Sequence, residues 1–89
     1  MFLLNKYSRW YFNITKNAST LERNCYTEKH HIVPKSLGGS NEVENIVKLT
    51  PREHFICHKL LTKMTEGESR KKMLWAMHQI IYQVNQHQV

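Results

Sequence analysis

The chain has 89 residues and a mass of 10.7 kDa, which leaves room for one small domain, and a domain of this size buries only about 60% of its unfolded surface. A metal or disulfides often complete the stability of such a domain, but two cysteines without a C-x-x-C pair exclude a disulfide framework and a thiolate zinc site. Thirteen Lys and Arg against seven Asp and Glu give a net charge of +6, which favours a polyanionic partner such as nucleic acid over a neutral one, with a solvated basic surface as the alternative.

The first predicted element is an amphipathic helix over residues 3–18. Leu3, Tyr7, Trp10 and Ile14 recur at spacings of four, three and four residues, which is the period of one helix face. We expect Trp10 and the tyrosines to pack against a core. Stacking of this aromatic stripe on nucleobases is the alternative.

A β-hairpin is predicted next. The segment "EKHHIV" favours a short strand that ends at Pro34, because proline lacks the backbone donor that a ladder needs. The segment "NIVKLT" favours a second strand, antiparallel to the first. The dozen residues between them, "PKSLGGSNEVEN", have no evident structure of their own, and loops of that kind are usually functional.

Thr50-Pro51-Arg52-Glu53 predicts the start of a second helix. A threonine cap, a proline at the first helical position and a glutamate three residues after the cap form a capping box. We expect this helix to run from Pro51 to about Met64, with Phe55, Leu60 and Leu61 facing inward.

The last predicted helix spans residues 68–84. Its apolar side is expected to consist of Met73, Met77, Ile80, Ile81 and Val84. Three basic residues near its start, Arg70, Lys71 and Lys72, oppose the helix dipole, and a phosphate contact would explain their position. A solvated charge run is the alternative. His78 and His87 are expected on the surface.

The remaining four histidines form a constellation. His54 and His58 are four residues apart on a helix, so both side chains can reach one ion. His30 and His31 are neighbours on a strand and point to opposite faces, so their roles should differ. If one of them turns towards the helix, it completes a three-histidine site with an open position, as in catalytic zinc sites. The other is then free to take a proton from water near neutral pH.

This order of elements resembles the ββα-metal motif of the HNH endonucleases, over residues 26–64. The pattern His-His-Ile-Val-Pro, Gly-Gly, Asn45, His-x-x-x-His is most similar to the three-histidine version of the colicin-type DNases. The segments "HHIVPKSLGGSN" and "NIVKLTPREHFICH" are similar to the corresponding segments of phage-borne HNH proteins. The resemblance implies an α+β fold: one domain over residues 1–89, in which a two-stranded antiparallel hairpin and a helix are flanked by an N-terminal and a C-terminal helix.

The resemblance also implies roles for individual residues. His30, His54 and His58 would be the metal ligands, and His31 the general base that activates water. Asn45 would hydrogen-bond across the loop and hold that base. The metal would polarise the scissile phosphate and stabilise the leaving 3′ oxygen, giving 5′-phosphate and 3′-hydroxyl ends. A lone domain is expected to act as a nickase.

The expected cofactor is one divalent metal ion per site. Three imidazoles suit zinc, nickel or another transition ion such as manganese, whereas family members with an aspartate in place of His30 use magnesium, which remains an alternative. Glu28, two residues before His30, could orient that ligand, or it could be a solvated glutamate. We expect Cys57 to pack in the core rather than to bind metal.

The expected partner is double-stranded DNA, bound mainly through its backbone, with strong salt dependence and weak sequence preference. Any further preference would come from a homodimer or a targeting protein. Seven basic residues are predicted to contact DNA: Lys35, Lys48, Arg52, Lys59, Arg70, Lys71 and Lys72. The alternative function is a catalytically silent nucleic-acid-binding or regulatory module with a structural zinc site.

The apolar run at the N-terminus is too short for a signal peptide or a membrane span. We therefore expect a cytoplasmic protein without a membrane partner, located in the host cytoplasm if a phage encodes it. Homing, genome packaging and interference with a competing genome are the roles that phage HNH proteins take, and the sequence favours none of them.

Overall fold

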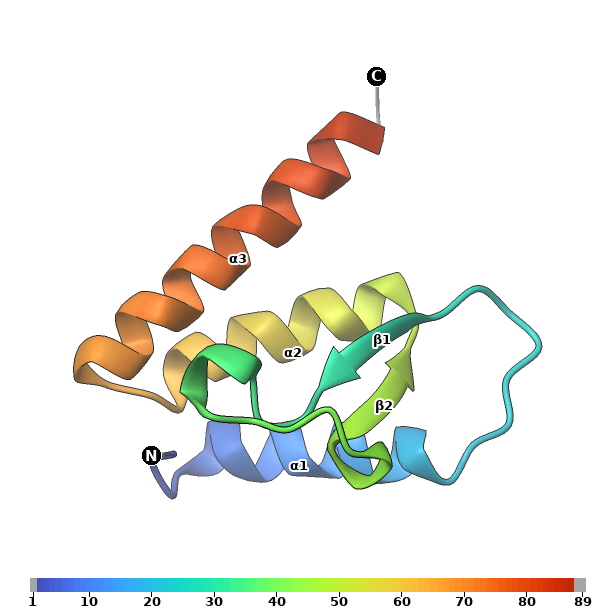
Figure 1. Ribbon diagram of the computed structural model, residues 1–89, viewed down its shortest axis with the longest axis horizontal. Helices are drawn as coiled ribbons and strands as arrows, with labels where there is room; N and C mark the ends of the chain where they lie inside the picture. Colours follow the sequence, from blue (N-terminus) through green and yellow to red (C-terminus); the bar gives the residue numbers. More distant parts are fainter. Residues whose placement is uncertain (1, 88–89) are drawn as a thin grey trace.

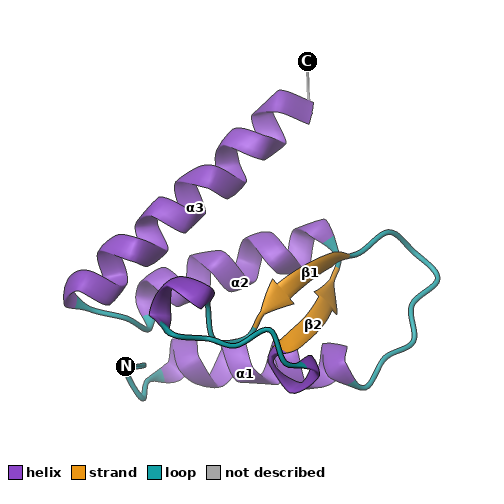
Figure 2. Ribbon diagram, viewed as in Figure 1, coloured by secondary structure: helices purple, strands orange, loops and turns teal. Residues whose placement is uncertain are grey.

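The computed structural model describes residues 2–87, with side chains for residues 2–83. Three helices and a two-stranded sheet follow one another in the order helix, strand, strand, helix, helix within these residues (Figures 1 and 2). Their bounds are α1 Lys6–Ser19, β1 Glu28–His31, β2 Ile46–Leu49, α2 Pro51–Lys63 and α3 Gly67–His87. This is a small α+β domain, which confirms the predicted class.

The hairpin sets the position of the histidines on β1. The two strands are antiparallel, as predicted, with His30 opposite Val47 and His31 opposite Ile46. His30 and Val47 are both buried, so this face of the hairpin points into the core, whereas His31, the last residue of β1, is half-buried. The connecting loop is not structureless as expected, because it contains short 3-10 turns at Lys35–Leu37 and Val43–Asn45.

The helix α1 begins later than predicted and buries a different face. Asn5 caps it, since the Ser8 backbone N–H donates to the Asn5 side chain at 3.0 Å and the Ser8 hydroxyl accepts from the Asn5 backbone. Its buried residues are Ser8, Tyr11, Thr15 and Ala18. The expectation that Trp10 packs in the core is wrong, because its side chain is 51% exposed. The same expectation is right for Tyr11, which is fully buried one residue further along the helix.

The helix α2 begins as the capping box predicted. Glu53 N–H donates to the Thr50 hydroxyl, and Thr50 N–H donates to the Glu53 carboxylate. Glu53 also pairs with Arg23 at 2.8 Å, which fastens the segment between α1 and β1 to this helix. The predicted inward face is wrong at Phe55, which is 37% exposed, and right at its other two positions. Cys57 packs in the core as expected.

The helix α3 packs its first half near α2, and its second half projects away from the rest of the domain (Figure 1). Met73 is buried, whereas Ile81, predicted on the apolar side, is exposed. His78 lies on the surface as predicted, and the side chains of Val84 and His87 lie outside the described residues. Among the described helices none is both long enough and apolar enough to cross a bilayer.

Candidate metal centre and active site

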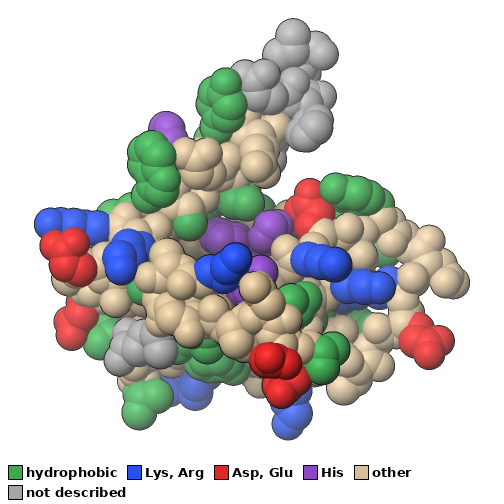
Figure 3. Space-filling view, in the orientation of Figure 1, with side chains coloured by type: hydrophobic (Ala, Val, Ile, Leu, Met, Phe, Trp, Pro, Cys, Tyr) green, Lys and Arg blue, Asp and Glu red, His purple; other side chains and the backbone are tan. Residues whose placement is uncertain are grey.

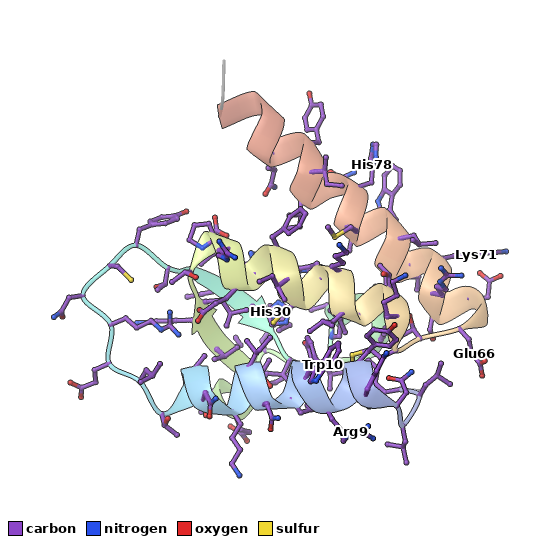
Figure 4. All side chains as sticks on the ribbon, turned by 180° about the vertical axis from the view of Figure 1, so that it is seen from behind. Arg9, Trp10, His30, Glu66, Lys71 and His78 are labelled. Carbon is purple, nitrogen blue, oxygen red and sulfur yellow. The ribbon has the colours of Figure 1, made fainter. Side chains whose placement is uncertain are left out.

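Three histidine side chains converge at the interface between the hairpin and α2. His30 comes from β1, and His54 and His58 come from successive turns of α2. One nitrogen of each ring lies within 4.8 Å of the other two, and the ring centroids are 4.7 to 5.2 Å apart. In the view of Figure 4, His30 lies between α1 and α2. Of the adjacent pair on β1, it is therefore His30 that turns towards the helix.

The spacing of these nitrogens fits a metal ion. The Nε2 atoms of His54 and His58 are 3.1 Å apart. Two nitrogens on a tetrahedral zinc ion, each at roughly 2.0–2.1 Å, would be separated by roughly 3.3 Å. The Nδ1 atom of His58 is buried without a hydrogen-bond partner in the described part of the chain, so its ring is held by packing. The donor set of three imidazoles matches transition ions.

Burial keeps two of these rings neutral. It lowers the pKa of His30 from 6.5 to about 3, with a smaller contribution from the neighbouring histidines. It lowers the pKa of His58 from 6.5 to about 4, with His54 as the secondary cause. A histidine binds metal through the lone pair of its neutral ring. Both side chains are therefore in the binding form at neutral pH.

The carboxylate of Glu28 orients one ligand. Nδ1–H of His54 donates to Glu28 Oε1 at 2.9 Å, so Nε2 is the bare nitrogen that faces the other histidines. The expected partner of this carboxylate was His30, and that detail is wrong. The reason is the register: Glu28 lies opposite Leu49, two residues before α2 begins, which brings its side chain to the first turn of the helix.

Tyr11 orients a second ligand and was not predicted. Its hydroxyl donates to the Ile32 carbonyl oxygen at 2.6 Å and lies 2.7 Å from His30 Nε2. Burial raises the pKa of Tyr11 above its ordinary value, so the hydroxyl keeps its single proton. A carbonyl oxygen can only accept, so Tyr11 donates its one hydroxyl proton to the Ile32 carbonyl. The tyrosine oxygen therefore accepts a hydrogen bond from His30 Nε2–H. His30 therefore presents Nδ1 to the metal centre.

The fourth histidine, His31, lines the same cavity as the other three. This cavity has a volume of about 200 Å³. His31 Nε2 lies 2.8 Å from Asn41 Oδ1. An amide oxygen only accepts, so Nε2 carries the proton and Nδ1 is free to accept one. Asn41 was not predicted, and a loop asparagine ten residues from the histidine gives no periodic signal that could have identified it.

Asn45 fastens the loop rather than the ring of His31. Its Oδ1 accepts from Val33 N–H at 2.9 Å, and its Nδ2 donates to the carbonyls of Val33 and Ser40 at 3.0 and 2.8 Å. A β-carbon at Gly39 would overlap the Val33 carbonyl, so the loop closes this tightly only with glycine there. The side chain that contacts His31, the predicted base, is that of Asn41. Asn45 holds the loop backbone next to it through the Ser40 carbonyl.

Positive charge borders the cavity on both sides. Figure 3 shows histidine atoms in a hollow below α3, with Lys and Arg side chains on either side of them. Lys29, which was not predicted, and Lys35 line the histidine cavity, and Lys71 and Lys72 line an adjoining groove.

The other predicted DNA contacts lie elsewhere. Lys48 lines a separate cavity beside Arg23. Arg70 donates to the Thr62 carbonyl at 3.2 Å, so it fastens the end of α2. Arg52 and Lys59 are exposed on α2.

The chain is similar in sequence to several phage proteins. The chain is 46% identical over 63 residues to "Probable mobile endonuclease D" of Enterobacteria phage T4, covering 65% of this chain and 24% of that protein. It is 44% identical over 59 residues to "Probable mobile endonuclease E" of the same phage, covering 65% and 42%. For "Probable mobile endonuclease C" the values are 38% over 66 residues, 70% and 31%.

The chain thus spans 24% to 42% of the length of these relatives. No family model matches the chain, and no solved structure is significantly similar to it. The similarity to the mobile endonucleases, the strand-strand-helix core and the three-histidine cluster agree with the family that the sequence resembles. The chain is thus similar, over about two thirds of its length, to phage proteins named as probable mobile endonucleases.

Proposed function

We propose that this protein is a metal-dependent DNA endonuclease that hydrolyses phosphodiester bonds with water activated by His31. One observation carries the proposal: three converging histidines and a fourth one of fixed tautomer line a single cavity. The names of the relatives support a nucleic-acid substrate. A purely structural metal site would need no fourth histidine in its cavity and no basic residues beside it.

The residues divide into holding and reacting groups. His30, His54 and His58 would hold one divalent ion, which when bound supplies Lewis-acid stabilisation of the phosphate and of the leaving oxygen. The all-nitrogen donor set favours zinc or nickel over manganese and magnesium. Lys29 and Lys35 border the cavity, where their charges can hold the phosphates on either side of the scissile bond.

His31 is the proposed general base. Its Nδ1 takes a proton from a water molecule while the water oxygen attacks phosphorus, and the bond from phosphorus to the 3′ oxygen breaks. The leaving 3′ oxygen takes a proton from a solvent water molecule, so the products are a 5′-phosphate and a 3′-hydroxyl. In the neutral ring, the contact with Asn41 places the single proton on Nε2 and leaves the lone pair of Nδ1 for the water.

The cleavage outcome follows from the number of reacting groups. One base and one set of metal ligands can cut one strand in each encounter. We therefore propose that a single domain nicks double-stranded DNA, and that a double-strand break requires two domains.

Nicking of supercoiled plasmid in the presence of zinc, nickel, manganese or magnesium tests the proposal. We expect conversion to the open circle with at least one ion, and a decrease of about 10²–10⁴-fold in the rate for His31→Ala. Asn13→Ala, an exposed neutral position on α1, is the control and should nick at the wild-type rate.

The metal affinity of His31→Ala separates loss of the base from loss of the ion. We expect calorimetric titration to give the wild-type affinity, because His31 is not one of the three converging ligands. No nicking with any of the four ions would refute the nuclease and favour a silent binding module. Undiminished nicking by His31→Ala would refute the assigned base.

A further inference from the structure

A second hollow adjoins the histidine cavity. It is a groove of about 590 Å³ between α3 and the 3-10 turn that contains Ser36, and His58 lines both hollows. The Lys72 ammonium donates to the Ser36 carbonyl oxygen at 3.2 Å across this groove. Whatever occupies the groove therefore lies next to a metal ligand.

The lining of the groove combines an aromatic ring with positive charge. Trp75 lines it and is 65% exposed, an unusual state for the largest apolar side chain. The ring of His78 stacks against the indole at 5.7 Å and an interplanar angle of 23°. Lys71 and Lys72 are the charged groups of the lining, the ring of His58 is neutral, and no carboxylate lies among the described lining residues. This composition suits a flat apolar ring attached to an anion.

We propose that the groove receives the base of an unpaired nucleotide adjacent to the scissile phosphate, stacked on Trp75, with its backbone phosphate near Lys71 and Lys72. This inference rests on the proposed nuclease function, because the metal centre locates the phosphate. The groove volume exceeds that of a single base, and base stacking on aromatic side chains is a common mode of single-strand binding.

The inference specifies the preferred form of the substrate. A base inside a duplex is stacked on both faces and cannot reach Trp75. The nucleotide at the groove must therefore be single-stranded, mismatched or turned out of the helix, and turning it out of a perfect duplex costs a few kcal/mol. DNA with an unpaired base at the cleavage point should bind more tightly than perfect duplex of the same length.

Fluorescence can test base binding without catalysis. The chain has two tryptophans, and Trp10→Phe leaves Trp75 as the single reporter. This variant would be titrated, with a chelator present, with a thymidine oligonucleotide and with an abasic strand of equal length and charge. We expect saturable quenching by the thymidine strand and little by the abasic strand. Equal quenching by both strands would overturn the inference, because only phosphate contacts would then be involved.

Affinity for labelled strands gives a second measurement. Removing a stacked base contact costs about 1–3 kcal/mol, so Trp75→Ala should weaken thymidine binding about 5- to 150-fold and leave abasic binding unchanged. Leu74→Ala is the matched control, since Leu74 is 47% exposed on the same helix and does not line the groove. Equal affinities of the two variants for the thymidine strand would overturn the inference.

The two proposals can fail separately. Base binding that depends on Trp75 in a protein that never nicks plasmid would refute the nuclease and support the base-binding groove. Nicking in a protein whose binding ignores the presence of bases would refute the groove and leave the nuclease intact.

Discussion

Replacing Tyr11 with phenylalanine removes a single oxygen atom that lies between His30 and Ile32. The oxygen accepts from His30 Nε2–H and donates to the Ile32 carbonyl, so it selects which nitrogen of His30 faces the metal centre. The phenylalanine ring keeps the shape of a fully buried side chain. The substitution therefore alters the tautomer of one ligand with little change in packing.

The expected effects follow from these two contacts. Loss of a hydrogen-bond partner behind a ligand typically costs about 10–100-fold in metal affinity, and we expect that range for Tyr11→Phe. The buried ring of His30 loses its partner at about 1–3 kcal/mol, and the part-buried carbonyl of Ile32 loses less, so the free energy of unfolding of the metal-free protein should fall by at least about 1–3 kcal/mol.

Calorimetric titration with zinc and with nickel would measure the affinity, and urea unfolding with a chelator present would measure the stability. Circular dichroism must first show that the variant is folded at the temperature of the titration. Tyr7→Phe on the same helix is the matched control, because the described part of the chain offers its hydroxyl no hydrogen bond. Wild-type metal affinity in a folded Tyr11→Phe protein would refute the assigned tautomer.

Two further predictions concern the remaining histidine contacts. Asn41→Ala should reduce the nicking rate and keep the metal affinity, because Asn41 contacts His31 and none of the three ligands; a parallel loss of metal affinity would contradict this role. The pKa values of about 3 for His30 and about 4 for His58 lie below the ordinary value of 6.5. Between these values and pH 6.5, the two histidines are protonated in the unfolded chain and neutral in the folded one. Their contribution to the stability of the metal-free protein is therefore complete above pH 6.5 and is lost as the pH falls towards those values, by up to about 1.4 kcal/mol per pH unit for each histidine. Urea unfolding across this window would show the decline, and a flat profile would contradict the burial of these rings.

The parts of this molecule that local patterns encode could be predicted from its sequence. The cap of α2 depends on Thr50 and Glu53, three residues apart, and the pair His54 and His58 depends on the helical period. Strand alternation separated His30 from its neighbour in the same way. Each of these features is fixed by contacts within a few residues.

The parts that depend on packing between elements could not be predicted. The buried face of α1 includes Ser8 and Thr15, whose hydroxyls bond to carbonyls of their own helix, so polar residues occupy positions that a hydrophobic pattern assigns to solvent. The face of α1 that is buried therefore contains Tyr11 and not Trp10. The partner of Glu28 was missed for a related reason, since the strand register places it beside α2.

The hydroxyl of Tyr11 limits how small a segment can be moved to another protein with this site intact. The strand-strand-helix segment contains the three converging histidines, but the group that orients His30 comes from α1. A graft of residues 28–63 alone would carry all three converging histidines and leave His30 free to exchange its tautomer. A transplanted site that keeps the tautomer of His30 must therefore include the N-terminal helix, that is, residues 5–63.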